Sequence, residues 1–268
     1  MPKWIAVDDL MEPGLEPFRS VRDRDLAGRA DLFMVEGEVA LRVLVAHGRF
    51  DLEGLLLSER RVQSLRPLLS ELPDHVPVYV IDHDATEAVV GFKMHRGIMG
   101  CGRRRPSPSP EQLLSGLVGE HMRVVLTEAV SNTDNMGGIF RNVAAFGGSA
   151  IFVDQQSCDP LYRKAIRVSS GQALALPFCR GAEILGMIAA VQAAGFTVAA
   201  LTPHEQALPV KDWRPPERVA LLVGAEGPGL TEAALMAADC RLSIPMAATV
   251  DSLNVATSVA VAMHTLQR

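Results

Sequence analysis

The sequence has few cysteines and lacks the patterns that mark secreted, metal-binding or membrane proteins. Its 4 cysteines are scattered, with no C-x-x-C pair, which argues for a reducing compartment and against a structural zinc site. The 7 histidines show no metal-ligand spacing either. No apolar run reaches the ~18 residues that a membrane span needs, and the first residues do not resemble a signal peptide. We therefore expect a cytoplasmic protein with no metal and no membrane segment.

An excess of basic residues is also lacking, because the formal net charge is −5 at pH 7. Any nucleic-acid binding must then come from a local basic surface rather than from bulk charge. Each arginine taken alone is typical of solvated surface, whereas grouped arginines favour a polyanionic partner. The groups are Arg19, Arg22, Arg24 and Arg29 near the start, Arg60 with Arg61, and Arg103 with Arg104 and Arg105.

The clearest break in the chain lies at residues 100–110, where prolines alternate with serines after the arginine run. Such a segment cannot continue a helix or a central strand and favours an extended connector. Before it, short apolar patterns alternate, with strands expected at residues 31–37, 52–57 and 76–81 and helices at 36–46, 60–72 and 84–90. The sequence therefore predicts a small α/β domain at residues 1–102, a linker at 103–112 and a second domain at 113–268.

The second domain is expected to be α/β with a mostly parallel sheet. Near-continuous apolar strands separated by helical patterns imply such a sheet, with helices covering both faces. We place strands at residues 123–130, 150–153, 197–202, 219–223 and 240–244, and helices at 136–146, 161–168, 182–194, 231–238 and 252–266.

Three blocks in this domain place polar side chains on loops, where a rigid scaffold usually presents its chemistry. The segment from Gly224 to Gly229 reads Gly-Ala-Glu-Gly-Pro-Gly. It puts a carboxylate and a proline where G-x-G-x-x-G needs open backbone for a pyrophosphate, so it argues against a dinucleotide. A loop with an acid suits a cationic or hydroxyl-rich ligand. Taken alone, the same pattern is equally typical of a tight turn between a strand and a helix.

The first block runs Asn135-Met-Gly-Gly-Ile-Phe-Arg141 and precedes a helix whose first turn is expected to hold Arg141. Asparagine with two glycines is also typical of an ordinary helix start. The macrodipole disfavours a cation at that position. Contact with an anion such as phosphate therefore explains Arg141 better than capping does.

The third block turns at residues 247–252 after an apolar strand. Ser252 beside Asp251 is a reasonable helix N-cap. Asn254 at the second or third helical position is less expected, because asparagine is a poor helix former. The following helix is small and apolar nearly all round, which favours burial on most of its surface, including at a subunit interface.

All three blocks, in this order and spacing, resemble the SpoU (TrmH-type) branch of the SPOUT RNA methyltransferases over about residues 120–266. The matching patterns are N-x-G-x-x-x-R, G-A-E-G-x-G and I-P-M-x(6)-S-L-N-V. Ser169-Ser-Gly-Gln-Ala173 with the later Leu-Pro177 resembles a further family stretch. The first domain is similar to the family's small ribosomal-protein-like substrate-binding domain, and His95-Arg-Gly-Ile98 departs from the family's H-Q-G-I by one residue.

The resemblance implies a knotted fold, with the last segment threaded into a deep trefoil knot, an exception to the rule of unthreaded connections. It implies S-adenosylmethionine as cofactor, methyl transfer to a ribose 2′-hydroxyl of ribosomal or transfer RNA, and an active site completed across a homodimer. The cofactor loops would include Leu201, Thr202, Gly224, Gly229, Ile244 and Leu253. The polar positions carried over as catalytic are Asn135, Arg141, Glu226, Ser252 and Asn254.

The reactive hydroxyl must lose its proton as the methyl group arrives. The resemblance points to Arg141 for this task, although a guanidinium pKa above ~12 makes an arginine a demanding base. We expect Arg141 instead to bind RNA phosphate and to lower the cost of the developing alkoxide. The other polar positions would orient the reactants, and alignment supplies much of the rate.

Two alternatives belong to other classes. A catalytically inactive RNA-binding protein would keep the fold and the surface arginines but would have lost Asn135, Arg141 or Asn254, and all three are present. A nucleotide-dependent oxidoreductase would need the missing G-x-G-x-x-G.

Overall fold

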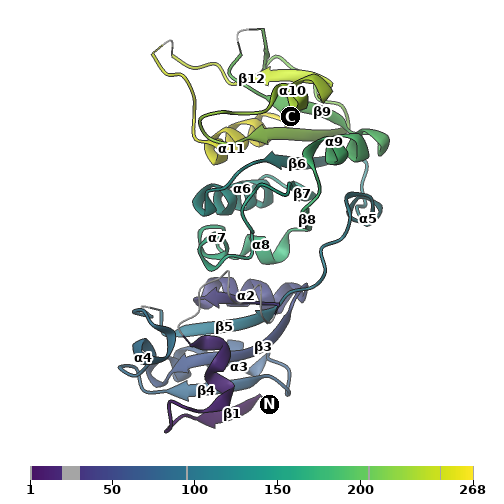
Figure 1. Cartoon of the computed structure of the whole chain (residues 1–268). Helices are drawn as coiled ribbons and strands as arrows, with labels where there is room; N and C mark the ends of the chain where they lie inside the picture. The colour runs from purple at the N-terminus through teal and green to yellow at the C-terminus, as the bar shows by residue number, and fades with distance from the viewer. Residues whose placement is uncertain (1, 20–30, 95, 205, 248, 268) are drawn as a thin grey trace. The chain divides into compact units, whose positions relative to one another are not determined.

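The computed structural model describes residues 2–19, 31–94, 96–204, 206–247 and 249–267 (Figure 1). Backbone contacts divide the chain into two compact units. The first unit comprises Met1–Arg105 and Leu161–Ala175, and the second comprises Pro106–Pro160 and Leu176–Arg268. Arg22, Arg24, Arg29 and His95, which belong to patterns of interest in the sequence, lie outside the described residues.

The first unit is built on a mixed sheet with the strand order β1-β4-β3-β5-β2. Strands β1 and β3 run parallel to β4, whereas β5 is antiparallel to both β3 and β2. The strands are β1 (Lys3–Ala6), β2 (Leu32–Glu36), β3 (Asp51–Ser58), β4 (Pro77–Ile81) and β5 (Ile98–Arg103). The helices are η1 (Pro13–Phe18), α2 (Glu38–His47), η2 (Glu59–Arg61), α3 (Val62–Ser70), α4 (Thr86–Val90), α7 (Arg163–Val168) and α8 (Gln172–Ala175).

The break expected at residues 100–110 was placed too early, because Gly100 to Arg103 form part of the central strand β5. A Cβ on Gly102 would stand 2.4 Å from the Phe33 ring. Glycine is therefore needed there so that this ring on β2 can lie across β5. The connector is also shorter at its far end, since Ser109 caps the helix α5 (Pro110–Ser115) in a capping box with Gln112.

The Ser-Ser-Gly-Gln-Ala motif forms the turn between α7 and α8. Ser170 and Gly171 both adopt positive φ angles, of 53° and 85°. A Cβ on Gly171 would lie 2.9 Å from the Ala40 Cα atom in α2. The glycine therefore permits both the left-handed backbone and a close approach of two helices.

The second unit contains a seven-stranded sheet in the described residues, with the order β10-β12-β9-β11-β6-β7-β8. Every pairing in it is parallel, so the expected mostly parallel sheet is confirmed. The strands are β6 (Met122–Glu128), β7 (Ala150–Val153), β8 (Phe178–Arg180), β9 (Thr197–Leu201), β10 (Leu208–Pro209), β11 (Arg218–Gly224) and β12 (Cys240–Ser243). The helices are α5, α6 (Thr133–Ala145), α9 (Ile184–Ala193), α10 (Glu232–Ala237) and α11 (Val255–Thr265).

Helices cover both faces of this sheet, as Figure 1 shows with α6 and α11 on one side and α5 and α9 on the other. The core beneath α9 joins residues that alternate along the strands with residues of the helix. It includes Val124, Leu126, Ile188 and Val198, each at most 1% exposed. None of the described helices is both long and apolar enough to cross a membrane.

Several elements were not expected from the sequence. Strands β1 and β10 are short pieces at the edges of their sheets, and β8 spans three residues. Helices α5 and α8 are also short, with six and four residues. Elements of this length carry too little periodicity to be recognised in a sequence.

Candidate active site

The candidate site lies where the order of the parallel sheet changes direction. Strands β6 and β11 are neighbours, but the chain leaves β6 toward β7 and β8, whereas β9 and β12 lie beyond β11. Ligands of open parallel sheets bind beyond the carboxyl ends of the strands at such a switch point. Asn135 follows β6 and Glu226 follows β11. The topology therefore brings the first two sequence blocks to the same edge.

A cavity of about 350 Å³ opens at this edge, within the usual range of ~300–1,000 Å³ for small-molecule sites. The segments that follow β9, β11 and β12 form its wall, together with the start of α11. All six residues expected to bind the cofactor line it: Leu201, Thr202, Gly224, Gly229, Ile244 and Leu253. Three expected catalytic residues, Glu226, Ser252 and Asn254, line it as well.

Other lining residues were not singled out from the sequence. Pro203 directly follows Thr202, which was chosen, and Ser258 lies one helical turn after Asn254. Once the start of α11 is known, the spacing of four residues identifies Ser258, because such positions share one helix face.

The loop at residues 224–230 is folded tightly upon itself. Gly229 donates a backbone hydrogen bond of 3.1 Å to the Ala225 carbonyl, and these two residues form an isolated antiparallel bridge. A Cβ on Gly224 would lie 2.4 Å from the Gly229 carbonyl carbon. Close backbone packing therefore requires glycine at position 224. The same loop also lines the cavity. The segment is thus both a tight turn and part of the candidate ligand site, and the two interpretations of its sequence are compatible.

Asn254 connects all three sequence blocks. Its Nδ2 donates one hydrogen bond of 2.7 Å to Asn135 Oδ1 and another of 2.7 Å to Glu226 Oε1. Its Oδ1 accepts a bond of 3.1 Å from the Thr257 amide, which makes Asn254 the N-cap of α11. The expected start of this helix at Ser252 is therefore wrong, and so is the helical position assigned to Asn254. Asparagine is a poor helix former but a favoured N-cap residue, so the capping position explains why asparagine stands there.

The contact between α6 and α11 sets the distance between Asn135 and Asn254. A Cβ on Gly138 would lie 2.7 Å from the Ala256 Cβ, so the two helices touch where neither has a large side chain. Asn142 Nδ2 donates a hydrogen bond of 2.7 Å to the Ala256 carbonyl. The second glycine of the first block therefore serves helix packing.

The structure places Arg141 differently from the sequence expectation. Helix α6 begins at Thr133 with Asn132 as its N-cap, whose side chain accepts a bond of 2.7 Å from the Asp134 amide. Arg141 consequently lies in the third turn, and the argument from the helix dipole is wrong because that effect fades within the first turn. Its side chain is exposed and forms no hydrogen bond or ion pair with the described residues. A guanidinium in this state is available to an anionic ligand.

The lining of the cavity suits a ligand with apolar, hydroxyl and cationic parts. Leu201, Leu230 and Ile244 supply apolar surface, Ser252 and Ser258 supply hydroxyl groups, and Glu226 supplies a carboxylate. Such a mixture fits the adenosine and sulfonium groups of S-adenosylmethionine better than a diphosphate. No group of three or more histidine, cysteine or acidic residues suited to a metal ion occurs among the described residues.

The arginine run begins at the end of β5 with Arg103, and two of its three charges are paired with carboxylates. Arg103 donates to both carboxylate oxygens of Glu53, at 2.7 and 3.0 Å, and these hydrogen bonds hold the pKa of Glu53 below its usual range. Arg105 pairs with Asp51 at 2.9 Å. Each of these two charges is therefore balanced locally by a carboxylate on β3.

Comparison with known sequences shows where the chain belongs. The model of the SpoU rRNA Methylase family matches residues 122–264. A Mycobacterium bovis protein named as an uncharacterized tRNA/rRNA methyltransferase is 37% identical over 98% of this chain and 92% of its own length. The Acinetobacter baylyi protein named 23S rRNA (guanosine-2′-O-)-methyltransferase RlmB is 26% identical over 87% of this chain and 91% of its own length.

Solved structures share the fold. An rRNA methyltransferase from Sinorhizobium meliloti with bound AdoMet aligns with a TM-score of 0.82 at 22% identity, over 98% of this chain and 97% of that one. The SpoU methyltransferase AviRb from Streptomyces viridochromogenes, in complex with AdoMet, aligns with a TM-score of 0.77 at 21% identity, over 95% and 96%. The sequence relatives, the family model and the shared fold agree, and the chain belongs to the SpoU family of RNA methyltransferases.

Proposed function

We propose that this chain transfers a methyl group from S-adenosylmethionine to a ribose 2′-hydroxyl of ribosomal or transfer RNA in the cytoplasm. The observation that carries the proposal is the hydrogen-bonded set of Asn135, Glu226 and Asn254, of which Glu226 and Asn254 line the cavity. This set joins the three sequence blocks of the family at one point, beside a cavity whose lining suits the cofactor. The alternative of an inactive RNA-binding protein gives no reason for that convergence.

The loops after β9, β11 and β12 would hold the cofactor, which when bound supplies a methyl group activated by a positively charged sulfur. Leu201, Ile244 and Leu253 would contact its apolar parts, and backbone groups of residues 224–229 would contact its polar parts. Glu226 would oppose the positive charge and fix Asn254. Ser252, exposed at the cavity edge, would hydrogen-bond the incoming ribose.

Arg141 would act on the RNA rather than on the cofactor. Its exposed guanidinium can bind a phosphate through two parallel hydrogen bonds and can lower the cost of the alkoxide that forms when the 2′-hydroxyl loses its proton. Asn135 Nδ2 donates no hydrogen bond to the described residues, although Oδ1 of the same amide is held by Asn254. That Nδ2 group would therefore be available to donate to a bound ligand.

Two further features complete the proposal: a deep trefoil knot in the second domain, and a homodimer. Helix α11 buries one face against α6, including Val259 and Met263. Its outer side and the preceding loop expose Val250, Leu253 and Val261, at 45%, 37% and 37%. Apolar surface of this kind favours a second copy of the chain. Light scattering at micromolar concentration should give twice the mass of the chain, and a monomer would contradict the shared site.

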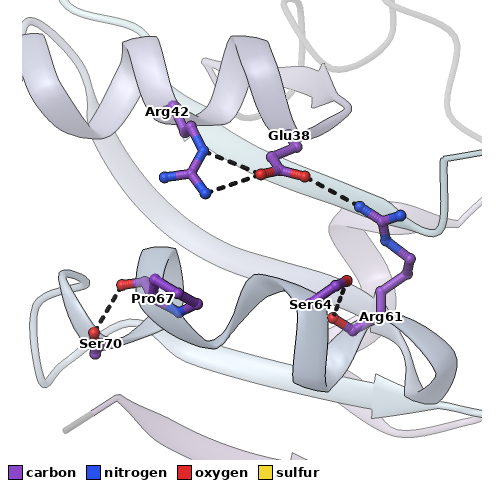
Figure 2. A network of polar contacts seen from close by, with 6 residues as sticks. All are labelled: Glu38, Arg42, Arg61, Ser64, Pro67 and Ser70. Carbon is purple, nitrogen blue, oxygen red and sulfur yellow. Dashed lines mark hydrogen bonds and ion pairs between the residues drawn. The ribbon is translucent and has the colours of Figure 1, made fainter.

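We further propose that residues 1–102 form an RNA-docking domain. Its docking cluster consists of Arg42, Arg61, Arg163 and Arg167 around Glu36 and Glu38, all within the first unit. Figure 2 shows Glu38 between Arg42 and Arg61, at 2.9 and 3.1 Å. Glu36 is 5% exposed and lies 3.6 Å from Arg163 and 3.5 Å from Arg167. Four guanidinium groups thus share two carboxylates. Two guanidinium groups lie against each carboxylate, and the carboxylates hold these arginines in fixed positions for phosphate.

Arg105, which is paired with Asp51, provides the control for this docking cluster. Replacing Arg61 and Arg167 with glutamine should weaken RNA binding and reduce the steepness of its salt dependence, by about 0.7 in the log–log slope for each phosphate that is no longer neutralised. Arg105→Gln should change neither, because Asp51 already balances that charge. Equal effects of the two sets would remove the docking cluster from RNA recognition.

A cofactor titration tests the proposed reaction class. Calorimetry should show binding of S-adenosylmethionine to the full chain and no binding of NAD. Binding of NAD alone would support an oxidoreductase. Cofactor binding without methyl transfer to any RNA would support the inactive alternative.

A further inference from the structure

Glu128 is a buried carboxylate that the proposed reaction does not use. It is the last residue of β6 and is 4% exposed. In the parallel register it stands opposite Gly224, the last residue of β11. It does not line the cavity. A carboxylate buried at this position needs partners that offset the loss of hydration.

Those partners both belong to Thr231. Glu128 Oε2 accepts a hydrogen bond of 2.9 Å from the Thr231 amide, and Oε1 accepts one of 2.7 Å from the Thr231 hydroxyl. The same hydroxyl accepts a bond of 3.2 Å from the Ala234 amide and so caps α10. Both oxygens of Glu128 are therefore engaged by one residue, with the carboxylate as acceptor in each bond.

This pair closes the base of the loop that carries Glu226. The loop leaves the sheet at Gly224, beside Glu128, and ends at Thr231, which is bonded to Glu128. Residues 226–229 at its tip are exposed, so few packing contacts hold the tip itself. Its backbone lines the cavity, and Glu226 must reach Asn254 at 2.7 Å. The position of the tip consequently depends on how its base is fixed.

We propose that Glu128 is a positioning residue that holds the loop at residues 224–231 in its cofactor-binding conformation through Thr231. This inference rests on the proposed function for its consequence in catalysis, but the clamp itself is a property of the chain. Loss of the clamp lets the base of the loop open. The wall of the cavity and the carboxylate of Glu226 then spend less time in place.

Glu128→Gln and Thr231→Val test the clamp in the full chain. Glutamine keeps one accepting oxygen for the Thr231 amide but places an NH2 group, which cannot accept, opposite the Thr231 hydroxyl, and it removes the charge from the remaining bond. Valine removes the hydroxyl while keeping the shape. Each variant should raise the Kd for S-adenosylmethionine about tenfold or more. Because both remove the same contact, the double variant should be little worse than the stronger single variant. Thr231→Ser keeps both donors. Its Kd for S-adenosylmethionine should therefore stay within about threefold of that of the original chain.

Glu111→Gln is the matched control. Glu111 also accepts a bond from an N-cap hydroxyl, that of Ser109 at 2.7 Å, but it lies on α5, away from the cavity lining. It should leave cofactor Kd within about twofold of the original chain. A substitution that only lowers the melting temperature should also leave the cofactor Kd unchanged, because the affinity of the folded fraction is not affected.

Hydrogen exchange separates failure of the clamp from failure of the proposed function. Without any ligand, Glu128→Gln should speed exchange of the Gly229 amide, which is bonded to Ala225 within the loop, relative to amides of β6. If the original chain binds no S-adenosylmethionine, the proposed function fails while this exchange result still decides the clamp. Unchanged loop exchange, or unchanged cofactor Kd in folded Glu128→Gln where the original chain binds, would overturn the inference.

Discussion

Asn254 Nδ2 donates a hydrogen bond of 2.7 Å to Oε1 of Glu226, which precedes it by 28 residues. The opposite orientation of the amide would turn Oδ1 toward the carboxylate and would leave the Thr257 amide without its cap. One side chain therefore caps a helix with its oxygen and fixes the cofactor loop and Asn135 with its nitrogen. The two tasks can be separated by substitution.

Asn254→Asp keeps the cap but reverses the other contacts. Aspartate is as good an N-cap as asparagine, whereas its carboxylate would repel Glu226 and the Asn135 oxygen. We expect the melting temperature to stay within a few degrees, since ~1 kcal/mol moves it by ~2–4 °C, while cofactor Kd rises about tenfold or more. Thermal melts and calorimetry measure these two effects. Unchanged affinity would mean that the Asn254–Glu226 contact does not shape the cavity.

Arg141→Ala should abolish methyl transfer and leave cofactor affinity within about threefold. The reason is that Arg141 is exposed and pairs with none of the described residues, so its removal breaks no internal contact. Arg141→Lys keeps the charge but loses the planar fork, so it should retain little activity. Single-turnover transfer assays compare the three proteins, and near-normal transfer by a folded Arg141→Ala protein would remove this residue from the mechanism.

Gly224→Ala should damage the cofactor loop. The new Cβ would meet Gly229 backbone atoms at 2.4 and 2.5 Å, and a backbone cannot move aside as a side chain can. Overpacking of this kind costs about 1–3 kcal/mol, with a matching loss of cofactor binding.

Gly186→Ala is its control, because a Cβ there meets nothing within 4 Å. Gly186 lies inside α9, on an exposed position. Alanine should raise the free energy of unfolding by about 0.5–1 kcal/mol. Denaturant unfolding compares the two variants, and equal stability would refute the steric argument.

The cysteines should resist alkylation in the native protein. Burial raises the pKa of the Cys101 and Cys179 thiols to about 12 and that of Cys158 to about 11. The reactive thiolate is therefore scarce at pH 8. Mass spectrometry after brief iodoacetamide treatment should find these three unlabelled in native protein and labelled after denaturation. Rapid labelling of native Cys179 would contradict its burial.

The sequence predicted the second unit well because its strands contain nearly continuous apolar runs. Residues 150–153 were expected as a strand and are β7, and the continuous run at residues 219–223 lies within β11. Parallel pairing follows once helices separate such strands. The first unit was harder, since Gly100 and Gly102 resemble loop residues, whereas in β5 they lie beneath side chains of α2, β3 and β2.

The candidate site was predicted as a set of residues and not as a geometry. The family patterns selected nine residues that line one cavity, but the starts of α6 and α11 were misplaced. Asn132 and Asn254 are caps whose role depends on where the backbone turns, which a sequence indicates to within a few residues. Glu128 escaped notice because a carboxylate at a strand end gives no sign of burial, and its partner lies 103 residues away.

The most direct test of the central claim is the chemical position of the transferred methyl group. RNA treated with this chain and S-adenosylmethionine carrying a radioactive methyl group is hydrolysed in alkali. Cleavage requires a free 2′-hydroxyl, so ribose methylation leaves a labelled dinucleotide that survives alkali. We expect the label in that dinucleotide, and its absence with Arg141→Ala. Label in single nucleotides, which places the methyl group on a base, would contradict the account.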